Sequence, residues 1–203
     1  MTQQMSSPIL VLADQSGAHL TSLARQALTL AASLTSGDVV ALSVASAPDV
    51  AALAELGATR LLHADLGPSG HSSVVASDAV IAALGTDSFG LVLLCSDYRG
   101  REIAGRVAAL TEAGVISGAA SVSFDGGVLQ VGKTALGGSW SMGIVLEGQT
   151  PIVGIASGII YEAPVASPVS LPPEPLAVEL SPEASAVEVV SSVADEEEGV
   201  SLT

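Results

Sequence analysis

Short apolar runs alternate with segments of helical period along the first 110 residues of the chain. The apolar runs are typical of strands buried on both faces, whereas the longer segments repeat apolar residues three and four positions apart. The pattern predicts strands over residues 8–13, 39–44, 59–63 and 91–95, and helices over residues 18–34, 49–56, 72–84 and 100–110. This strand–helix order predicts a parallel, doubly wound sheet with right-handed crossovers.

The pattern changes after residue 114, where alternation replaces the helical period. Two alternating arms, 120–124 and 127–131, flank Asp125-Gly126, a dipeptide that favours a β-hairpin. Two later apolar runs, 144–146 and 151–156, are expected to be further strands of the main sheet. The predicted fold class is therefore α/β with three layers: a mostly parallel sheet between alanine-rich helices, with a late antiparallel hairpin.

The last forty residues have the composition of a linker. Prolines recur between residues 164 and 182, and residues 195–198 form an acidic run. We therefore expect an α/β domain over residues 1–161 and an extended acidic tail, or Pro/Ser/Glu-rich linker, over residues 162–203. Partial alternation in residues 186–193 favours one edge strand within this tail.

Charge and cysteine content restrict the class of protein. The formal net charge is −15, which argues against binding to nucleic acid or to an anionic membrane, because both would repel the chain. No apolar run approaches the roughly 20 residues of a membrane-spanning helix, and the N-terminus lacks a secretory signal pattern. The single cysteine, Cys95, fits a reducing compartment, so we expect a cytoplasmic protein.

Positive charge is concentrated at one place in this acidic chain. Three of the five arginines, Arg99, Arg101 and Arg106, follow the most hydrophobic predicted strand within eight residues of one another. Open α/β sheets bind ligands beyond the carboxyl ends of their strands, so these arginines are candidates for contact with a partner or an anion. A solvated turn explains Arg99 and Arg101 equally well. Glu102 lies four residues before Arg106, so a surface ion pair on the predicted helix accounts for Arg106.

One segment matches a nucleotide-binding pattern by its letters. Gly127 to Thr134 fits the phosphate-loop pattern G-x-x-x-x-G-K-[ST], but its central Val-Leu-Gln-Val favours a strand and no helix follows. We interpret it as the second arm of the hairpin. The chain has no G-x-G-x-x-G or G-x-S-x-G motif, and His19, His63 and His71 have no metal-ligand spacing. We therefore assign no catalytic, cofactor-binding or metal-binding residue.

Several segments follow one another in a characteristic order and spacing. They are residues 9–13, the Gly-Ala-Thr-Arg of residues 57–60, residues 100–108, the hairpin at Asp125-Gly126, Gly137-Gly138 and the run from Pro151 to Ile155. In this order the chain resembles the alpha subunit of electron transfer flavoproteins, over residues 8 to about 160. From the helix motif of that family we carry over only Arg101 and Arg106, and we assign neither of them a cofactor contact. Gly105 stands where the family usually has proline, and Ala156 where it often has arginine.

The resemblance implies the N-terminal domain of that subunit, which packs against the beta subunit of a heterodimeric electron carrier. Such carriers pass electrons from acyl-CoA or other dehydrogenases to an acceptor. In that family a C-terminal domain of the alpha subunit mainly holds FAD, and its glycine-rich motifs do not occur in this sequence. We therefore expect a scaffold rather than an enzyme, with FAD in the assembled complex, a separately supplied FAD-binding domain, and no FAD on this chain alone.

A free-standing nucleotide-binding or stress-type α/β module is the alternative, because such folds host many functions. Its phosphate site would need a glycine-rich loop near the carboxyl edge of the sheet. Gly67 and Gly70 are the only suitably spaced pair there, and the later glycine that such modules use is missing.

Overall fold

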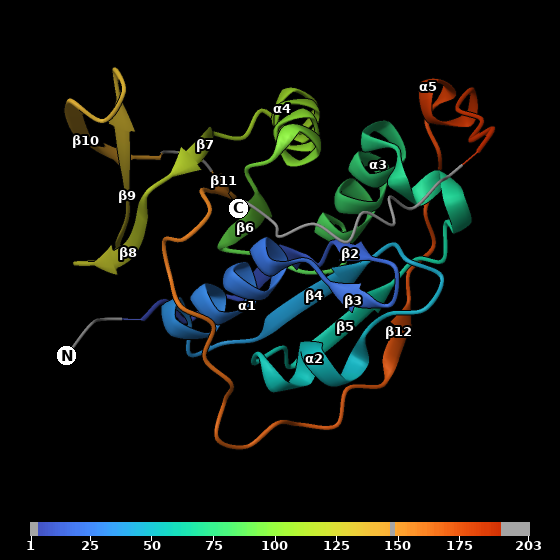
Figure 1. Ribbon diagram of the computed structural model, residues 1–203, viewed down its shortest axis with the longest axis horizontal. Coiled ribbons are helices and arrows are strands. Elements are labelled where there is room, and N and C mark those ends of the chain that lie inside the picture. Colours follow the sequence, from blue (N-terminus) through green and yellow to red (C-terminus); the bar gives the residue numbers. More distant parts are fainter. Residues whose placement is uncertain (1–3, 147–148, 192–203) are drawn as a thin grey trace, which may run out of the picture.

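The computed structural model describes residues 4–146 and 149–191, which form a seven-stranded sheet between two layers of helices (Figure 1). The sheet consists of β1 (Ile9–Leu12), β4 (Val39–Ser43), β5 (Arg60–His63), β6 (Leu91–Cys95), β7 (Val115–Ala119), β11 (Ile152–Ile155) and β12 (Pro173–Pro175). Their order across the sheet is β12-β5-β4-β1-β6-β11-β7, and every neighbouring pair is parallel. The α/β class and the parallel sheet are thus confirmed.

Helices cover both faces of this sheet, and each face buries alternate residues of the strands. The helical segments are α1 (Ser22–Leu34), α2 (Val50–Glu55), the 3-10 helix η1 (Gly67–His71), α3 (Ser73–Leu84), α4 (Tyr98–Thr111) and α5 (Pro182–Ser185). Ile9 and Val11 of β1 pack in the core that contains α1 and α2, whereas Leu10 and Leu12 pack in the core that contains α3 and α4. Both faces of β1 are buried, so its sequence is continuously apolar. None of the helices in the described residues is long and apolar enough to cross a bilayer.

Two of the helices that follow the carboxyl ends of strands, α1 and α4, start at side-chain caps that shift their predicted first residues. α1 begins four residues later than predicted, because β2 (Gln15–Ser16) and β3 (His19–Leu20) form a small hairpin before it. The Thr21 side chain then accepts a hydrogen bond from Ala24 N at 3.2 Å. α4 begins two residues earlier than predicted, where the Asp97 carboxylate accepts a hydrogen bond from Gly100 N at 2.7 Å. An oxygen-bearing side chain at this position satisfies a free N–H of the first turn.

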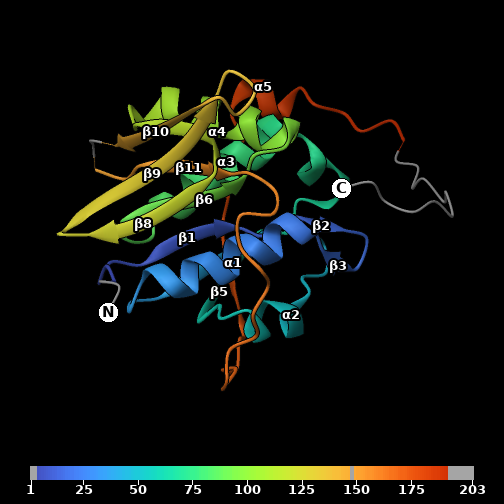
Figure 2. The same cartoon turned by 60° about the vertical axis from the view of Figure 1, so that its left-hand side comes forward.

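A second, antiparallel sheet lies at the β7 edge of the main sheet, away from β12 (Figures 1 and 2). It contains β8 (Ser121–Asp125), β9 (Val128–Ala135) and β10 (Trp140–Val145), with β9 in the middle. The predicted hairpin at Asp125-Gly126 is confirmed as β8–β9. The prediction that residues 144–146 join the main sheet is wrong, because Ile144 and Val145 pair with β9 after a turn at two glycines with positive φ.

The remaining differences concern the two strands that complete this side of the main sheet. The run at 151–156 does extend the main sheet, as β11, which inserts between β6 and β7. The edge strand β7, residues 115–119, was not predicted. It is only partly apolar and carries a glycine, Gly118, at φ 74°. Its place at the edge, paired on one side alone, tolerates such a sequence.

Residues 156–186, which we call the C-terminal strap, run back around the domain (Figure 1). The strap passes α1, adds β12 beside β5, and ends in α5, which packs against α3. The predicted edge strand at 186–193 is not formed over residues 187–191, and residues 192 and 193 lie outside the described residues. The free edge of β5 is already occupied by β12, so the tail finds no open strand there to pair with.

Candidate functional site

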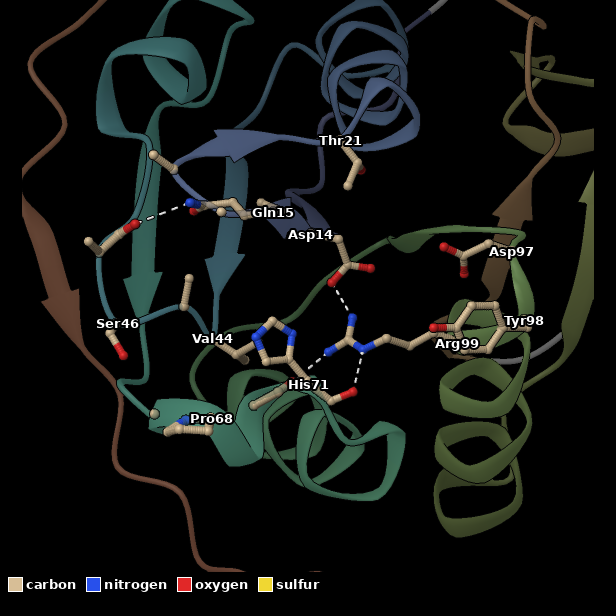
Figure 3. Close-up of a pocket in the computed structure, with 17 residues that line it drawn as sticks. Asp14, Gln15, Thr21, Val44, Ser46, Pro68, His71, Asp97, Tyr98 and Arg99 are labelled. Carbon is tan, nitrogen blue, oxygen red and sulfur yellow. Dashed lines mark hydrogen bonds and ion pairs between the residues drawn. The ribbon is translucent and has the colours of Figure 1, made fainter. Parts of the chain in front are cut away.

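A cavity lies at the carboxyl ends of the central strands. From β1 the chain builds the sheet outward through β4 and β5, and then returns to the other side of β1 with β6. The loops after β1 and β6 therefore diverge, and ligands of open α/β proteins bind in this kind of crevice. Here it is a pocket of about 680 Å³, lined by the loops that follow β1, β4, β5 and β6 (Figure 3). We call it the switch-point pocket.

An ion pair crosses the interior of the switch-point pocket. Arg99, in the first turn of α4, donates through Nη1 to Oδ1 of Asp14, which follows β1 (Figure 3). Its Nη2 donates to Gly70 O at 2.7 Å, and its Nε donates to His71 O at 3.1 Å. All three nitrogens therefore have acceptors inside the protein, and the side chains of both Arg99 and Asp14 are only 13% exposed. The charge of Arg99, one of the candidates for contact with a partner or an anion, is thus paired with a carboxylate of the protein itself.

Burial also controls the acidity of the two groups that end β1 and β6. Burial raises the pKa of Asp14, and the neighbouring guanidinium of Arg99 opposes that rise. Burial likewise raises the pKa of the Cys95 thiol, and the nearby Asp14 carboxylate adds to this effect. Cys95 is therefore a protonated thiol in the core, where it packs as a small hydrophobic residue.

The other polar groups around the pocket hold its loops in place. Gln15 donates through Nε2 to Ala47 O at 3.1 Å and accepts from Asp49 N at 3.1 Å, which joins the loops after β1 and β4. Gly70 approaches the end of β4 so closely that a Cβ there would lie 2.7 Å from Val44 O. The loops that form the pocket wall are thus held together by hydrogen bonds between their own polar groups.

Arg101 lies in the same turn of α4 but points to a different environment. Its Nε donates to Ser96 O at 3.0 Å and approaches Ser96 Oγ at 3.3 Å, while the residue as a whole is exposed. Among the described residues, the other four arginines form ion pairs and Arg101 forms none. Of the predicted arginine cluster, Arg101 is the residue that the fold leaves exposed, whereas Arg99 and Arg106 are partly buried.

Arg106 is held by the strap and by α3, not by Glu102. Its Nη2 donates to Ser181 Oγ at 3.0 Å and lies 3.7 Å from Asp78 Oδ1 and 3.5 Å from Glu183 Oε2. The Glu102 carboxylate instead accepts from Ser73 Oγ at 2.6 Å. The predicted ion pair within α4 is therefore wrong, because α4 packs beside α3 and both partners find acceptors or donors there. The three arginines do not converge on one site.

These contacts also decide whether the pocket suits a dinucleotide or a nucleotide phosphate. The lining contains two carboxylates, Asp14 and Asp97, and each nitrogen of its one arginine already donates to an acceptor within the protein. The phosphate-loop match at residues 127–134 falls almost entirely in β9, which pairs with strands on both sides. Its interpretation as a hairpin arm is confirmed, and its backbone N–H groups do not form a phosphate cradle. The arginine that lines this pocket is therefore already paired with a carboxylate of the protein and is not left free for a diphosphate.

Apolar side chains gather instead on the small sheet. Five large hydrophobic residues there are exposed by 40 to 76%: Val128, Leu136, Trp140, Met142 and Val145. The register places Ile144 opposite the fully buried Val131, so both point toward the core. Because alternate residues share a face, Met142 and Trp140 continue the same face beyond the core that covers it. The alternation of apolar residues along 140–145 is the sequence signal for this face.

Comparison with known proteins agrees with this architecture. A family model described as the electron transfer flavoprotein domain matches residues 9–192. No curated protein matches the chain. The family match spans the main sheet, the small sheet and the strap, so the chain belongs to the electron transfer flavoprotein domain family.

Proposed function

We propose that this member of the electron transfer flavoprotein domain family is the alpha-subunit-like domain of a heterodimeric, FAD-containing electron carrier. Family membership itself supports an electron-carrier role of the flavoprotein type and association with other subunits of that kind. Within the complex, this domain is the scaffold: it binds the beta subunit and orients a separate FAD-binding domain. Acyl-CoA or other dehydrogenases then meet the assembled complex rather than this domain alone.

The observation that carries this proposal is the uncovered end of the small sheet. On the inward face Val131 is fully buried, whereas Met142 and Trp140 on the same face are 40% and 64% exposed. An apolar face that extends past its own core leaves a hydrophobic area that a second protein covers in an assembly. Trp140 is a residue type that frequently dominates the binding energy of such surfaces.

The cofactor enters this proposal only through the complex. When bound, the flavin supplies the redox chemistry, and the protein supplies position and electrostatics. The switch-point pocket contributes no free cation for a diphosphate, because Arg99 is bound to Asp14 and to two backbone carbonyls. We therefore assign no FAD contact to the residues of this chain.

A nucleotide-binding module remains the second candidate, and the position of the switch-point pocket is the observation that favours it. The same internal ion pair weighs against it. Titration of the purified chain with AMP and ATP, followed by calorimetry, separates the two: saturable binding of either nucleotide would favour the module.

The direct test of the proposal first looks for a second electron transfer flavoprotein chain encoded next to this one in the source genome, and then uses that neighbouring chain in a binding experiment. Purified alone, the present chain should be colourless. Mixed with that second chain, it should elute as a 1:1 complex in size-exclusion chromatography with light scattering. Separate elution of the two chains, or stoichiometric yellow flavin on the present chain alone, would contradict the scaffold role.

A further inference from the structure

The first turn of α4 carries an exposed tyrosine and an exposed arginine one helical turn apart. Tyr98 is 82% exposed, and Arg101 follows three residues later, which places both on the same face of the helix. Figure 3 shows Tyr98 at the α4 side of the switch-point pocket. Tyrosine and arginine are the residue types enriched at the centres of protein interfaces.

The position of Arg101 is rigid before any partner arrives. The Asp97 cap fixes the start of α4, and Gly100 passes so close to Cys95 O that no side chain fits between them. The two hydrogen bonds from Nε to Ser96 anchor the root of the guanidinium, and no described residue bonds to its Nη1 and Nη2. A guanidinium held in this way loses little freedom on binding, and its outward N–H groups match a carboxylate as a fork.

The charges around Arg101 indicate which kind of partner it meets. The chain has a formal net charge of −15, yet its other four arginines form ion pairs with carboxylates of the same chain. The nearby acids are also engaged: Asp97 caps α4 and Glu102 accepts from Ser73. One exposed arginine is too few donors to hold a free phosphate or sulfate. It suits a carboxylate that a protein surface delivers together with apolar contact for the tyrosine ring.

The outward face of α4 lets a partner come close along its length. Gly105 and Ala109 occupy this exposed face one and two turns after Arg101, and a Cβ added at Gly105 would meet nothing within 4 Å. β7 packs against both α4 and β9, so this face and the small sheet share one edge of the molecule. Leu110, near the end of α4, and Val115, at the start of β7, are exposed by 58% and 41%.

We propose that Tyr98 and Arg101 form a second anchor for the partner subunit, receiving a segment that carries a carboxylate beside an apolar side chain. This inference rests on the proposed function, and it names the residues of α4 that would contact the partner subunit. Arg99, although adjacent, is excluded from this role because its nitrogens are bound inside the switch-point pocket.

The test measures the affinity of the neighbouring electron transfer flavoprotein chain for three variants by titration calorimetry. Arg101→Met and Tyr98→Ala should each weaken binding by about tenfold or more, and Arg101→Met should also reduce the dependence of affinity on salt. Arg101→Lys keeps the charge but not the fork, and should fall between Arg101→Met and the wild type. Unchanged melting temperatures would exclude misfolding as the cause.

Arg60→Met is the matched control. It removes the same charge, but Arg60 begins β5, at the opposite end of the strands, where it pairs with Glu174 and Asp87. It should leave partner affinity unchanged. Wild-type affinity in both Arg101→Met and Tyr98→Ala, while the wild type itself binds, would overturn the anchor and leave the scaffold role standing. Absence of wild-type binding would overturn the scaffold role and the anchor with it.

Discussion

The two edges of the seven-stranded sheet are completed in opposite ways. At one edge, the strap lays β12 beside β5, and its prolines leave few free N–H groups for further pairing. Arg60 binds Glu174 in this strand through Nε and Nη2, at 3.0 and 2.8 Å. At the other edge, β7 leads directly into a small sheet whose apolar face is partly uncovered.

The two edges therefore differ in what covers them: the strap of the same chain covers the β5 edge, which we call the closed edge, and the β7 side, which we call the open edge, keeps an exposed apolar face. The closed edge is polar and is clamped along the strap: Arg25 binds Glu162, Arg60 binds Glu174, and Arg106 lies near Glu183. Such pairs give the strap a defined path even though each contributes little stability. The open edge has few charges and several large apolar side chains, which is the composition of a surface that loses water on association.

The largest effect expected from this comparison concerns association at the open edge. Replacing Trp140 with serine should weaken binding of the neighbouring flavoprotein chain by about 30-fold or more, because a central interface tryptophan commonly contributes at least about 2 kcal/mol. Trp140 is 64% exposed, so the free energy of unfolding should hardly change. Calorimetric titration and urea unfolding measure the two quantities.

Tyr161→Ser is the control for this variant, because Tyr161 is a 95% exposed aromatic residue on the strap. It should leave both the affinity and the stability unchanged. Equal loss of affinity in Trp140→Ser and Tyr161→Ser would contradict the claim that the partner binds at the open edge.

The next largest effect is a loss of stability at the closed edge. Gly57 has φ 95°, and a Cβ there would lie 2.9 Å from Ala32 Cβ and 3.0 Å from Val165 Cγ1. Gly57→Ala should therefore lower the free energy of unfolding by about 1–3 kcal/mol, through backbone strain and through displacement of the strap from α1. Urea denaturation checks the loss; an unchanged midpoint would mean that the strap is loosely attached here.

A smaller effect should appear in the pH dependence of the strap. The hydrogen bond from Arg60 lowers the pKa of Glu174. Its stabilisation is therefore complete above the unfolded-state pKa of about 4.3 and is lost as the pH falls through the lower folded-state value. Because Glu174 is 42% exposed, the contribution should be below about 1 kcal/mol. Glu174→Gln should make unfolding stability less dependent on pH in this acidic range, and a curve parallel to the wild type would contradict the assignment.

The smallest effect tests the open face of α4. Gly105 lies inside a helix, and an added methyl group meets no neighbour within 4 Å. Gly105→Ala should raise the free energy of unfolding by about 0.5–1 kcal/mol, because alanine favours the helix more than glycine does. Thermal unfolding provides the measurement. Destabilisation would show that another part of the chain covers this face in solution.

Local pattern was enough to predict most of the framework. Continuous apolar runs identified β1, β4, β5 and β6, because strands buried on both faces need apolar side chains at every position. Alternation around Asp125-Gly126 identified β8 and β9. Weak edge strands were missed: β7 is interrupted by glycine, and β12 consists of Pro-Glu-Pro, which no propensity rule assigns to a strand. Their pairing depends on neighbours that are distant in the sequence.

The candidate site was predictable only in outline. The sequence placed Arg99 and Arg101 after a buried strand, at the end of the sheet where they indeed lie. It did not indicate that Arg99 turns inward to Asp14, 85 residues earlier, while Arg101 stays outside. It likewise suggested Glu102 as the partner of Arg106, whereas the strap supplies Ser181 and Glu183 from the far end of the chain.

By itself, then, the amino-acid sequence determined the layers of this protein. Whether a segment must be buried on one face or on both can be seen from its own pattern of apolar positions. The tertiary structure alone decided which arginines form ion pairs within the chain and which one stays exposed. That outcome depends on how closely side chains from separate segments approach one another, and a difference of two positions along one helical turn sends one arginine into a pocket and the other into solvent.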